Sequence, residues 1–166
     1  MKRLVRKSID DTAEISLNEL ISDCSDFSNW VFPDASALQL EYQVEYQNHL
    51  KYEFGDIWPT EESFLEAANN GSVIDLSKGE DEKIGNRSYT VNMDELLDLL
   101  KSYKSWPEFR NTGTVQEIVE GFKEDQPMIM PIVVEEDGYS HIMSGNTRLD
   151  IAFMMNVTPK VLWIKI

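Results

Sequence analysis

The most constraining feature of this chain is the order of strand and helix patterns that begins at residue 131. Residues 131–134 (Pro-Ile-Val-Val) and 139–143 (Tyr-Ser-His-Ile-Met) predict two strands, and the Glu-Glu-Asp-Gly sequence between them predicts a hairpin turn. Residues 149–155 show an apolar helix pattern that ends at an Asn-Val-Thr-Pro turn, and residues 161–166 predict a further strand. We therefore expect a mixed α/β fold in which a hairpin strand runs directly into a helix.

The strand becomes the helix at a Ser-Gly-Asn-Thr-Arg sequence, formed by Ser144, Gly145, Asn146, Thr147 and Arg148. The first backbone N–H groups of a helix have no partner within it, and they meet the positive end of the helix dipole, so a phosphate binds well there. Glycine lets the backbone approach an anion closely, and arginine adds a charged donor. The sequence therefore predicts a phosphate site. The alternative is a tight turn with a capped helix and a solvated Arg148.

The residues before the hairpin complete a longer pattern. An amphipathic helix pattern opens at Thr114 and leads into the proline-flanked strand. This order of elements, from Thr114 to Ile166, resembles the ParB/sulfiredoxin superfamily, and in particular the short ParB-like proteins of phage genomes that carry Ser-Gly-Asn-Thr-Arg. The resemblance extends back to Tyr89, with the Trp-Pro-Glu-Phe-Arg sequence at 106–110 in place of the family's Pro-x-x-x-Arg loop. It implies a small mixed sheet with helices, of the α/β (α+β) class.

The resemblance also implies a nucleotide site. Gly145 and Arg148 match the family's Gly-x-x-Arg helix start, which binds nucleotide phosphates, and Mg²⁺ with ATP or CTP are the implied cofactors. The Glu-Arg pair of ParB proteins is replaced here by Asn146 and Thr147, which weakens the case for CTP. Sulfiredoxins carry their redox cysteine at the position of Asn146, and an amide cannot act as a thiolate. We therefore expect no sulfinic acid reductase activity.

Three residues upstream of the hairpin are implied to complete this site. The resemblance places Arg110 and Thr114 against the phosphates. It also places Glu117, one turn after Thr114 on the same helix face, where a carboxylate orients a metal-bound water or acts as a base. The alternative for Glu117 is a carboxylate on the solvent side of an amphipathic helix. The sequence does not identify the metal ligands.

The charge of the chain limits its partners. Thirty acidic residues against 15 basic ones give a formal net charge of −15 at pH 7. Such a field repels the phosphates of nucleic acids, so we expect the isolated chain not to bind duplex DNA. The same charge is compatible with a basic protein as a partner.

The cysteine count and hydropathy bear on location. A single cysteine, Cys24, cannot form an internal disulfide and fits a reducing cytoplasm, that of a bacterial host if the chain is phage-encoded. No apolar run reaches the length that crosses a membrane. The two histidines, His49 and His141, stand apart in the sequence, and we interpret His141 as a strand residue with a hydrogen-bonded ring.

The N-terminal half has a different pattern. Residues 35–54 predict a helix with an aromatic face, interpreted as core packing, and the Trp-Pro-Thr-Glu-Glu sequence at 58–62 predicts the start of another helix. We expect residues 1–86 to form a mainly helical extension and residues 87–166 the ParB-like domain. In the alternative, residues 15–20 supply the first strand of the core, and the residues from there to Tyr89 are an insertion within a single domain.

These features lead to one functional hypothesis and one alternative. The chain is predicted to be a nucleotide-phosphate-binding ParB-like protein acting in phage or plasmid DNA metabolism. If the chain is an enzyme, it is predicted to be a Mg-dependent nucleoside triphosphate hydrolase or phosphotransferase. The alternative is a non-catalytic ParB-like binding module, or an acidic inhibitor that engages a nucleic-acid-processing protein.

Overall fold

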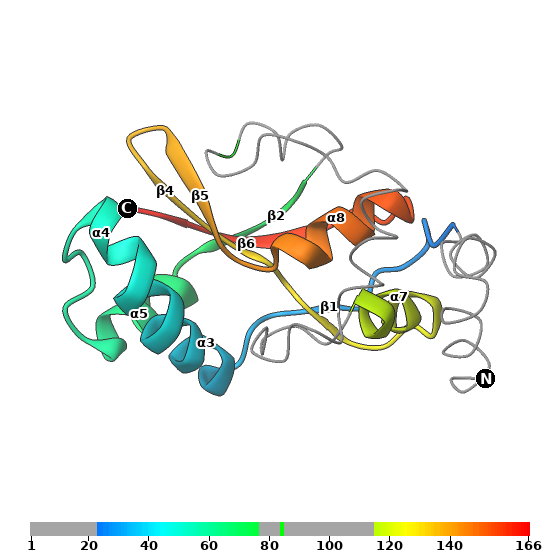
Figure 1. Ribbon diagram of the computed structural model, residues 1–166, viewed down its shortest axis with the longest axis horizontal. Helices are drawn as coiled ribbons and strands as arrows, with labels where there is room; N and C mark the ends of the chain where they lie inside the picture. The colour runs from blue at the N-terminus through cyan, green and yellow to red at the C-terminus, as the bar shows by residue number, and fades with distance from the viewer. Residues whose placement is uncertain (1–22, 77–83, 85–114) are drawn as a thin grey trace. The chain divides into compact units, whose positions relative to one another are not determined.

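The computed structural model describes residues 23–76, 84 and 115–166 of the chain (Figure 1). Arg110, Thr114 and the strand expected near Tyr89 lie outside these residues, as does the expected boundary at residue 86. The described part is a mixture of helices and mixed sheets, so the predicted α/β class is confirmed. Within the described residues, no helix is both long enough and apolar enough to cross a lipid bilayer.

A four-stranded mixed sheet has the order β2-β6-β4-β5. Strand β6 (Lys160–Lys165) pairs antiparallel with β2 (Ser72–Asp75) and parallel with β4 (Ile132–Glu136), and β4 pairs antiparallel with β5 (Tyr139–Ser144). All three strands predicted after residue 131 are therefore confirmed. A second, two-stranded parallel sheet joins β1 (Trp30–Val31) to β3 (Met128–Ile129), and its sequence signal was too short to predict.

The predicted turns of the C-terminal part are also confirmed. Asp137 and Gly138, between β4 and β5, both have positive φ angles, 49° and 83°, as a tight two-residue hairpin turn requires. Helix α8 (Asn146–Met154) follows β5 after one residue. Asn156 has φ 58°, and it ends the helical segment in the left-handed conformation that asparagine tolerates.

Residues 35–54 form one continuous helix in three segments: α3 (Ala35–Glu41), the π-helix η1 (Tyr42–Leu50) and α4 (Lys51–Phe54). The helix was predicted, but its π-helical middle was not. Its buried apolar residues recur at every fourth position. In an α-helix of 3.6 residues per turn such a row drifts by about 40° at each step. The wider π turn reverses this drift, so the row stays on one face. The residues of this row are Leu38, Tyr42, Tyr46, Leu50 and Phe54.

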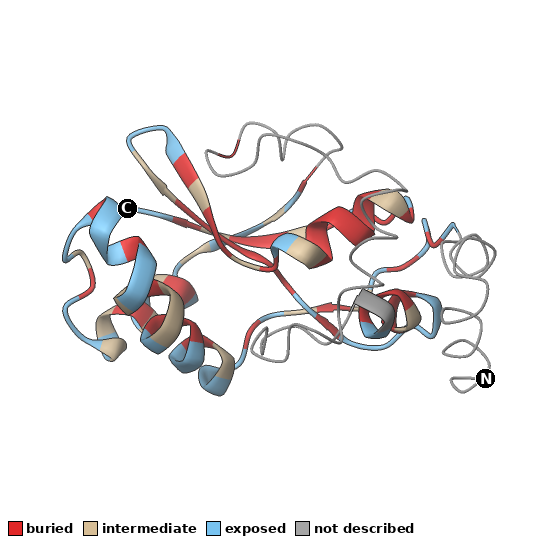
Figure 2. Ribbon diagram, in the orientation of Figure 1, coloured by how far each residue is buried: buried red, intermediate tan, exposed pale blue. Residues whose placement is uncertain are grey.

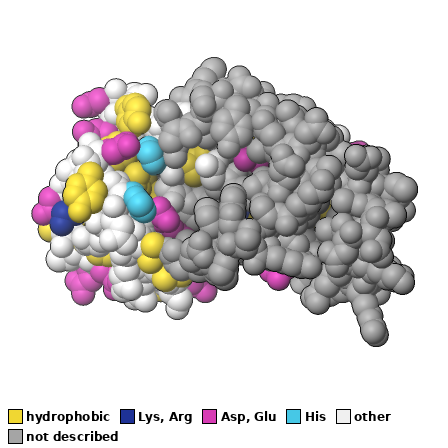
Figure 3. All heavy atoms as spheres, in the orientation of Figure 1, with side chains coloured by type: hydrophobic (Ala, Val, Ile, Leu, Met, Phe, Trp, Pro, Cys, Tyr) yellow, Lys and Arg dark blue, Asp and Glu magenta, His cyan; other side chains and the backbone are white. Residues whose placement is uncertain are grey.

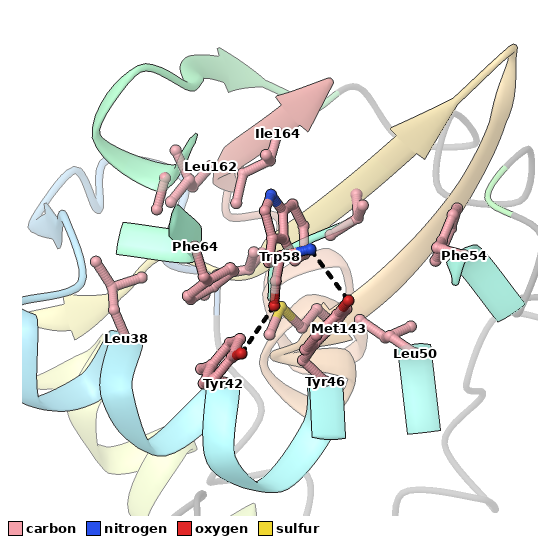
Figure 4. Close-up of a cluster of buried hydrophobic side chains, with 13 residues drawn as sticks. Leu38, Tyr42, Tyr46, Leu50, Phe54, Trp58, Phe64, Met143, Leu162 and Ile164 are labelled. Atoms are coloured by element: carbon pink, nitrogen blue, oxygen red, sulfur yellow. Dashed lines mark hydrogen bonds between the residues drawn. The ribbon is translucent and has the colours of Figure 1, made fainter. Parts of the chain in front are cut away.

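This row forms the main hydrophobic core with one face of the four-stranded sheet (Figures 2 and 4). Tyr42 donates from its hydroxyl to Trp58 O at 2.8 Å, and the hydroxyl of Tyr46 accepts from Trp58 N at 3.1 Å. The aromatic face is therefore core, as interpreted from the sequence. The sheet contributes alternate residues of β4 and of β6, as one face of a pleated sheet must, and one residue of β5. They are Ile132, Val134, Met143, Leu162 and Ile164.

Helix α5 (Glu61–Asn69) begins where the sequence predicts. The Thr60 side chain accepts from Ser63 N, and Ser63 Oγ accepts from Thr60 N, which completes a capping box. The helix buries Phe64 and Ala68 in the core and ends before Gly71. A Cβ atom at Gly71 would lie 2.9 Å from Leu162 Cδ1 and 3.0 Å from Trp163 O. Glycine is therefore required for the close approach of this turn to β6.

The chain divides into two compact units. Among the described residues, one unit holds 30–76, 84, 128–146 and 159–166, with both sheets, and the other holds 23–29, 115–127 and 147–158. Strand β2, from the N-terminal half, shares a sheet with β6, so the described elements of the two halves are interleaved. The division expected at residue 86 falls outside the described residues, so it stays a prediction.

The described residues of the second unit contact one another. It contains helix α7 (Val115–Lys123), as predicted, and most of α8. Cys24 is buried, and its N–H donates to Met155 O at 2.8 Å. Phe27 packs edge-on against Phe122 of α7, with ring centroids 4.9 Å apart. The segment from 23 to 29 thus contacts α7 and the residue that follows α8.

Candidate functional site at the β5–α8 junction

The Ser-Gly-Asn-Thr-Arg sequence lies where it was predicted, at the end of a hairpin strand and the start of a helix. Ser144 is the last residue of β5, and Asn146 is the first residue of α8. Gly145, between them, has φ 92°, a conformation that side-chain-bearing residues rarely adopt. The junction is therefore built around a glycine whose lack of a Cβ atom lets the chain turn sharply from strand to helix.

The side chains of the junction differ in exposure. Asn146 is exposed, while Ser144 and Thr147 are half-buried. Arg148 is only 6 % exposed, so it is not the solvated residue of the alternative interpretation. A cation in the first turn of a helix opposes the helix dipole, and an anion bound at the helix start would relieve this effect.

A buried carboxylate that was not predicted contacts the junction. Glu41, at the end of α3, is 7 % exposed, and Ser144 Oγ donates to Glu41 Oε1 at 3.1 Å. The two residues are 103 positions apart in the chain. Glu41 directly precedes Tyr42 of the buried row, and its sequence context is that of a charged residue at the margin of an amphipathic helix.

The pairing of Glu41 with Ser144 has a definite chemical capacity. An ionised carboxylate accepts hydrogen bonds and binds hard cations such as Mg²⁺. It also orients a serine hydroxyl by accepting its proton in a hydrogen bond. Within the described residues, no group of three or more His, Cys, Asp or Glu side chains is arranged to hold a metal ion. A cation at Glu41 would draw further ligands from a bound anion and from water.

Of the other predicted site residues, Glu117 alone lies within the described part of the chain. Glu117 is exposed on α7, and the buried residues beside it are Ile118 and Val119. This exposure agrees with its alternative interpretation as the solvent side of an amphipathic helix, and its catalytic role stays a prediction. Arg110 and Thr114 lie outside the described residues.

Comparison with protein-family models, with curated proteins and with solved structures finds no match for this chain. The resemblance to the ParB/sulfiredoxin superfamily, and the nucleotide site that it implies, therefore stay predictions.

Proposed function

We propose that the β5–α8 junction binds the phosphate groups of a nucleotide. The observation that carries this proposal is Gly145, whose positive φ angle places the backbone N–H groups of the first turn of α8 at a sharp strand-to-helix junction. Such N–H groups, together with the helix dipole, favour an anion. The guanidinium of Arg148, in the same turn, supplies a fork that matches phosphate oxygens.

Mg²⁺ fits this proposal through Glu41. Protein sites for Mg²⁺ usually supply only one or two carboxylates, and the phosphates of the substrate and water complete the octahedron. Glu41, held by Ser144 Oγ, is a carboxylate of this kind beside the loop. It would repel a phosphate that arrives without a cation, so binding of a nucleoside triphosphate should depend on Mg²⁺.

Turnover is the further step of this proposal. Phosphoryl transfer depends on positioning and on charge neutralisation rather than on covalent chemistry by the protein. Glu117 is the carboxylate that the family resemblance assigns to the reaction, and Glu41 is the carboxylate that contacts the loop. Phosphate release from a nucleoside triphosphate, measured for Glu117→Gln and for Glu41→Gln, would assign the catalytic role to one of these carboxylates.

The alternative is a binding module or an acidic inhibitor that acts on a nucleic-acid-processing protein. The net charge of −15 favours it, because it suits a basic protein surface better than a nucleic acid. This alternative does not require the junction to bind any nucleotide.

The first test is ligand-induced stabilisation. We expect one or more of ATP, CTP, GTP and UTP, each with Mg²⁺, to raise the melting temperature. A ligand at 100 times its dissociation constant adds about 2.7 kcal/mol, roughly 5–10 °C for a chain of this size. Omitting Mg²⁺ should reduce the shift. No shift with any nucleotide, and no heat of binding by calorimetry, would leave the junction as a structural turn and favour the alternative.

A further inference from the structure

The β4–β5 hairpin and helix α4 form a mixed aromatic and acidic surface. Tyr139 and His141 share the face of β5 that carries the core residue Met143, because alternate residues of a strand share a face. The Tyr139 hydroxyl donates to Glu53 Oε2 at 3.4 Å, and His141 Nδ1 lies 3.2 Å from the same oxygen. The Phe54 ring centroid is 6.0 Å from that of Tyr139 and 6.3 Å from that of His141. We call Tyr139, His141, Glu53 and Phe54 the hairpin patch.

Negative charge surrounds the hairpin patch. Glu136 is directly opposite Tyr139 in the hairpin and shares its face, and Glu45 of η1 lies close enough to His141 to act on it electrostatically. Burial lowers the pKa of His141 below its ordinary 6.5, while the carboxylates of Glu53 and Glu45 act in the opposite direction. The ring is therefore neutral at pH 7, and it does not offset the charge of the carboxylates.

The view in Figure 3 agrees with this description. Histidine side chains (cyan) lie beside acidic (magenta) and hydrophobic (yellow) side chains on this face, and a Lys or Arg side chain (dark blue) lies at its margin. The surface is accessible, since the side chain of Glu53 is 46 % exposed and Tyr139 is 48 % exposed. Within the described residues, both contacts of Glu53 go to Oε2, so Oε1 can accept from an outside donor.

We infer that the hairpin patch binds an arginine side chain of a basic protein partner. The guanidinium donates to Glu53 Oε1 and lies over the exposed ring of Tyr139, which the hydroxyl–carboxylate contact holds beside it. Arginine suits the patch better than lysine because its planar, weakly hydrated group both stacks on aromatic rings and donates in a fork. Charge complementarity with Glu45 and Glu136 selects a partner segment that carries further basic residues.

This site is distinct from the phosphate junction. Tyr139 begins β5 and Ser144 ends it, so about 17 Å of strand separates the two positions at the usual rise per residue. The ligands also have opposite charge, a cation at the hairpin patch and an anion at the junction. The inference therefore does not depend on the proposed function, and each can fail without the other.

The test measures binding of three fluorescein-labelled peptides to the full chain. The peptides share a Gly-Ser background and differ only in carrying three arginines, three lysines or three citrullines. We expect fluorescence anisotropy to show the arginine peptide binding most tightly and the citrulline peptide not at all. Glu53→Gln should weaken the arginine peptide about tenfold, and Tyr139→Ala about three- to fivefold. Tyr139→Phe keeps the ring and should cost less than Tyr139→Ala. Glu62→Gln, an exposed carboxylate on α5, is the matched control and should change little.

Acid pH gives an independent readout. Protonation of His141 places a positive charge 3.2 Å from Glu53 Oε2, where it competes with the guanidinium. Because the pKa of His141 is lowered from its ordinary 6.5, affinity should be constant from pH 8 to 7 and fall only at more acidic pH. His141→Gln cannot be protonated, and it should remove most of this fall while leaving affinity at pH 7.5 within about threefold.

Two results would overturn the inference. Equal binding of the arginine and lysine peptides, with Glu53→Gln and Glu62→Gln equally weakened, would mean that the acidic chain attracts cations without a site. Undiminished binding by Glu53→Gln and Tyr139→Ala, each shown to be folded by its thermal unfolding curve, would place the arginine elsewhere.

Discussion

Tyr46→Ala is expected to destabilise the protein by about 3–5 kcal/mol, the range for removing a fully buried aromatic side chain. Tyr46 has no exposed surface, and its ring packs between Tyr42 and Trp58, with centroids 5.2 Å from each. Its hydroxyl donates to Gly55 O at 2.8 Å and accepts from Trp58 N at 3.1 Å. The alanine variant therefore leaves a cavity together with two backbone groups that have lost their partner.

Two further variants separate these contributions. Tyr46→Phe keeps the ring and removes only the hydroxyl, so we expect a loss of about 1–3 kcal/mol, the cost of leaving buried polar groups unpaired. Tyr52→Ala is the matched control in the same continuous helix, because Tyr52 is 82 % exposed and should cost less than about 0.5 kcal/mol. Urea unfolding followed by tryptophan fluorescence measures all three. Similar losses for Tyr46→Ala and Tyr52→Ala would mean that the π-helical segment does not pack on the sheet as described.

Arg148→Ala is expected to weaken binding of the preferred nucleotide by roughly 10- to 150-fold, which corresponds to about 1.5–3 kcal/mol for a hydrogen bond to a charged group. Arg148→Lys keeps the charge but loses the planar fork, so its loss should be smaller. Lys51→Ala, which removes a positive charge from an exposed position of α4, is the control for general electrostatics. Isothermal titration calorimetry with Mg²⁺ present measures each affinity.

The burial of Arg148 requires a second measurement on the same variants. A side chain that is 6 % exposed contributes to packing as well as to ligand binding, so Arg148→Ala should also lower the melting temperature of the unliganded protein. Nucleotide affinity is therefore measured well below the melting temperature of the variant, where the protein is folded. This isolates the contribution of Arg148 to ligand binding from its contribution to stability. A nucleotide affinity equal to that of the parent protein would give Arg148 a structural role alone.

The parts of the fold that were predicted from sequence are those fixed by local chemistry. The hairpin turn follows from Gly138, the helix start of α5 from the Thr60 cap, and the junction from Gly145, because each position requires a particular backbone or capping geometry. The row of aromatic residues gave the helix over residues 35–54, since its spacing spans several turns.

The parts that were missed depend on contacts between distant segments. The bond between Ser144 and Glu41 spans 103 residues, and the contact between Tyr139 and Glu53 spans 86. The sequence around Glu41 and around Glu53 does not distinguish either carboxylate from one on the solvent-exposed face of a helix. The pairing of β2 with β6 was missed for the same reason: a four-residue strand carries too little pattern to name its partner.

The place of β6 between β2 and β4 has a consequence for how the sheet forms. The β4–β5 hairpin is local in sequence and can form early, whereas β2 has to wait for a strand that is 85 residues away, the separation of the contact between Lys160 and Asp75. Until β6 arrives, one edge of the hairpin is an open template for other chains. The slow step of folding, and the main risk of aggregation, should therefore lie at the docking of β6 rather than at the formation of the helices.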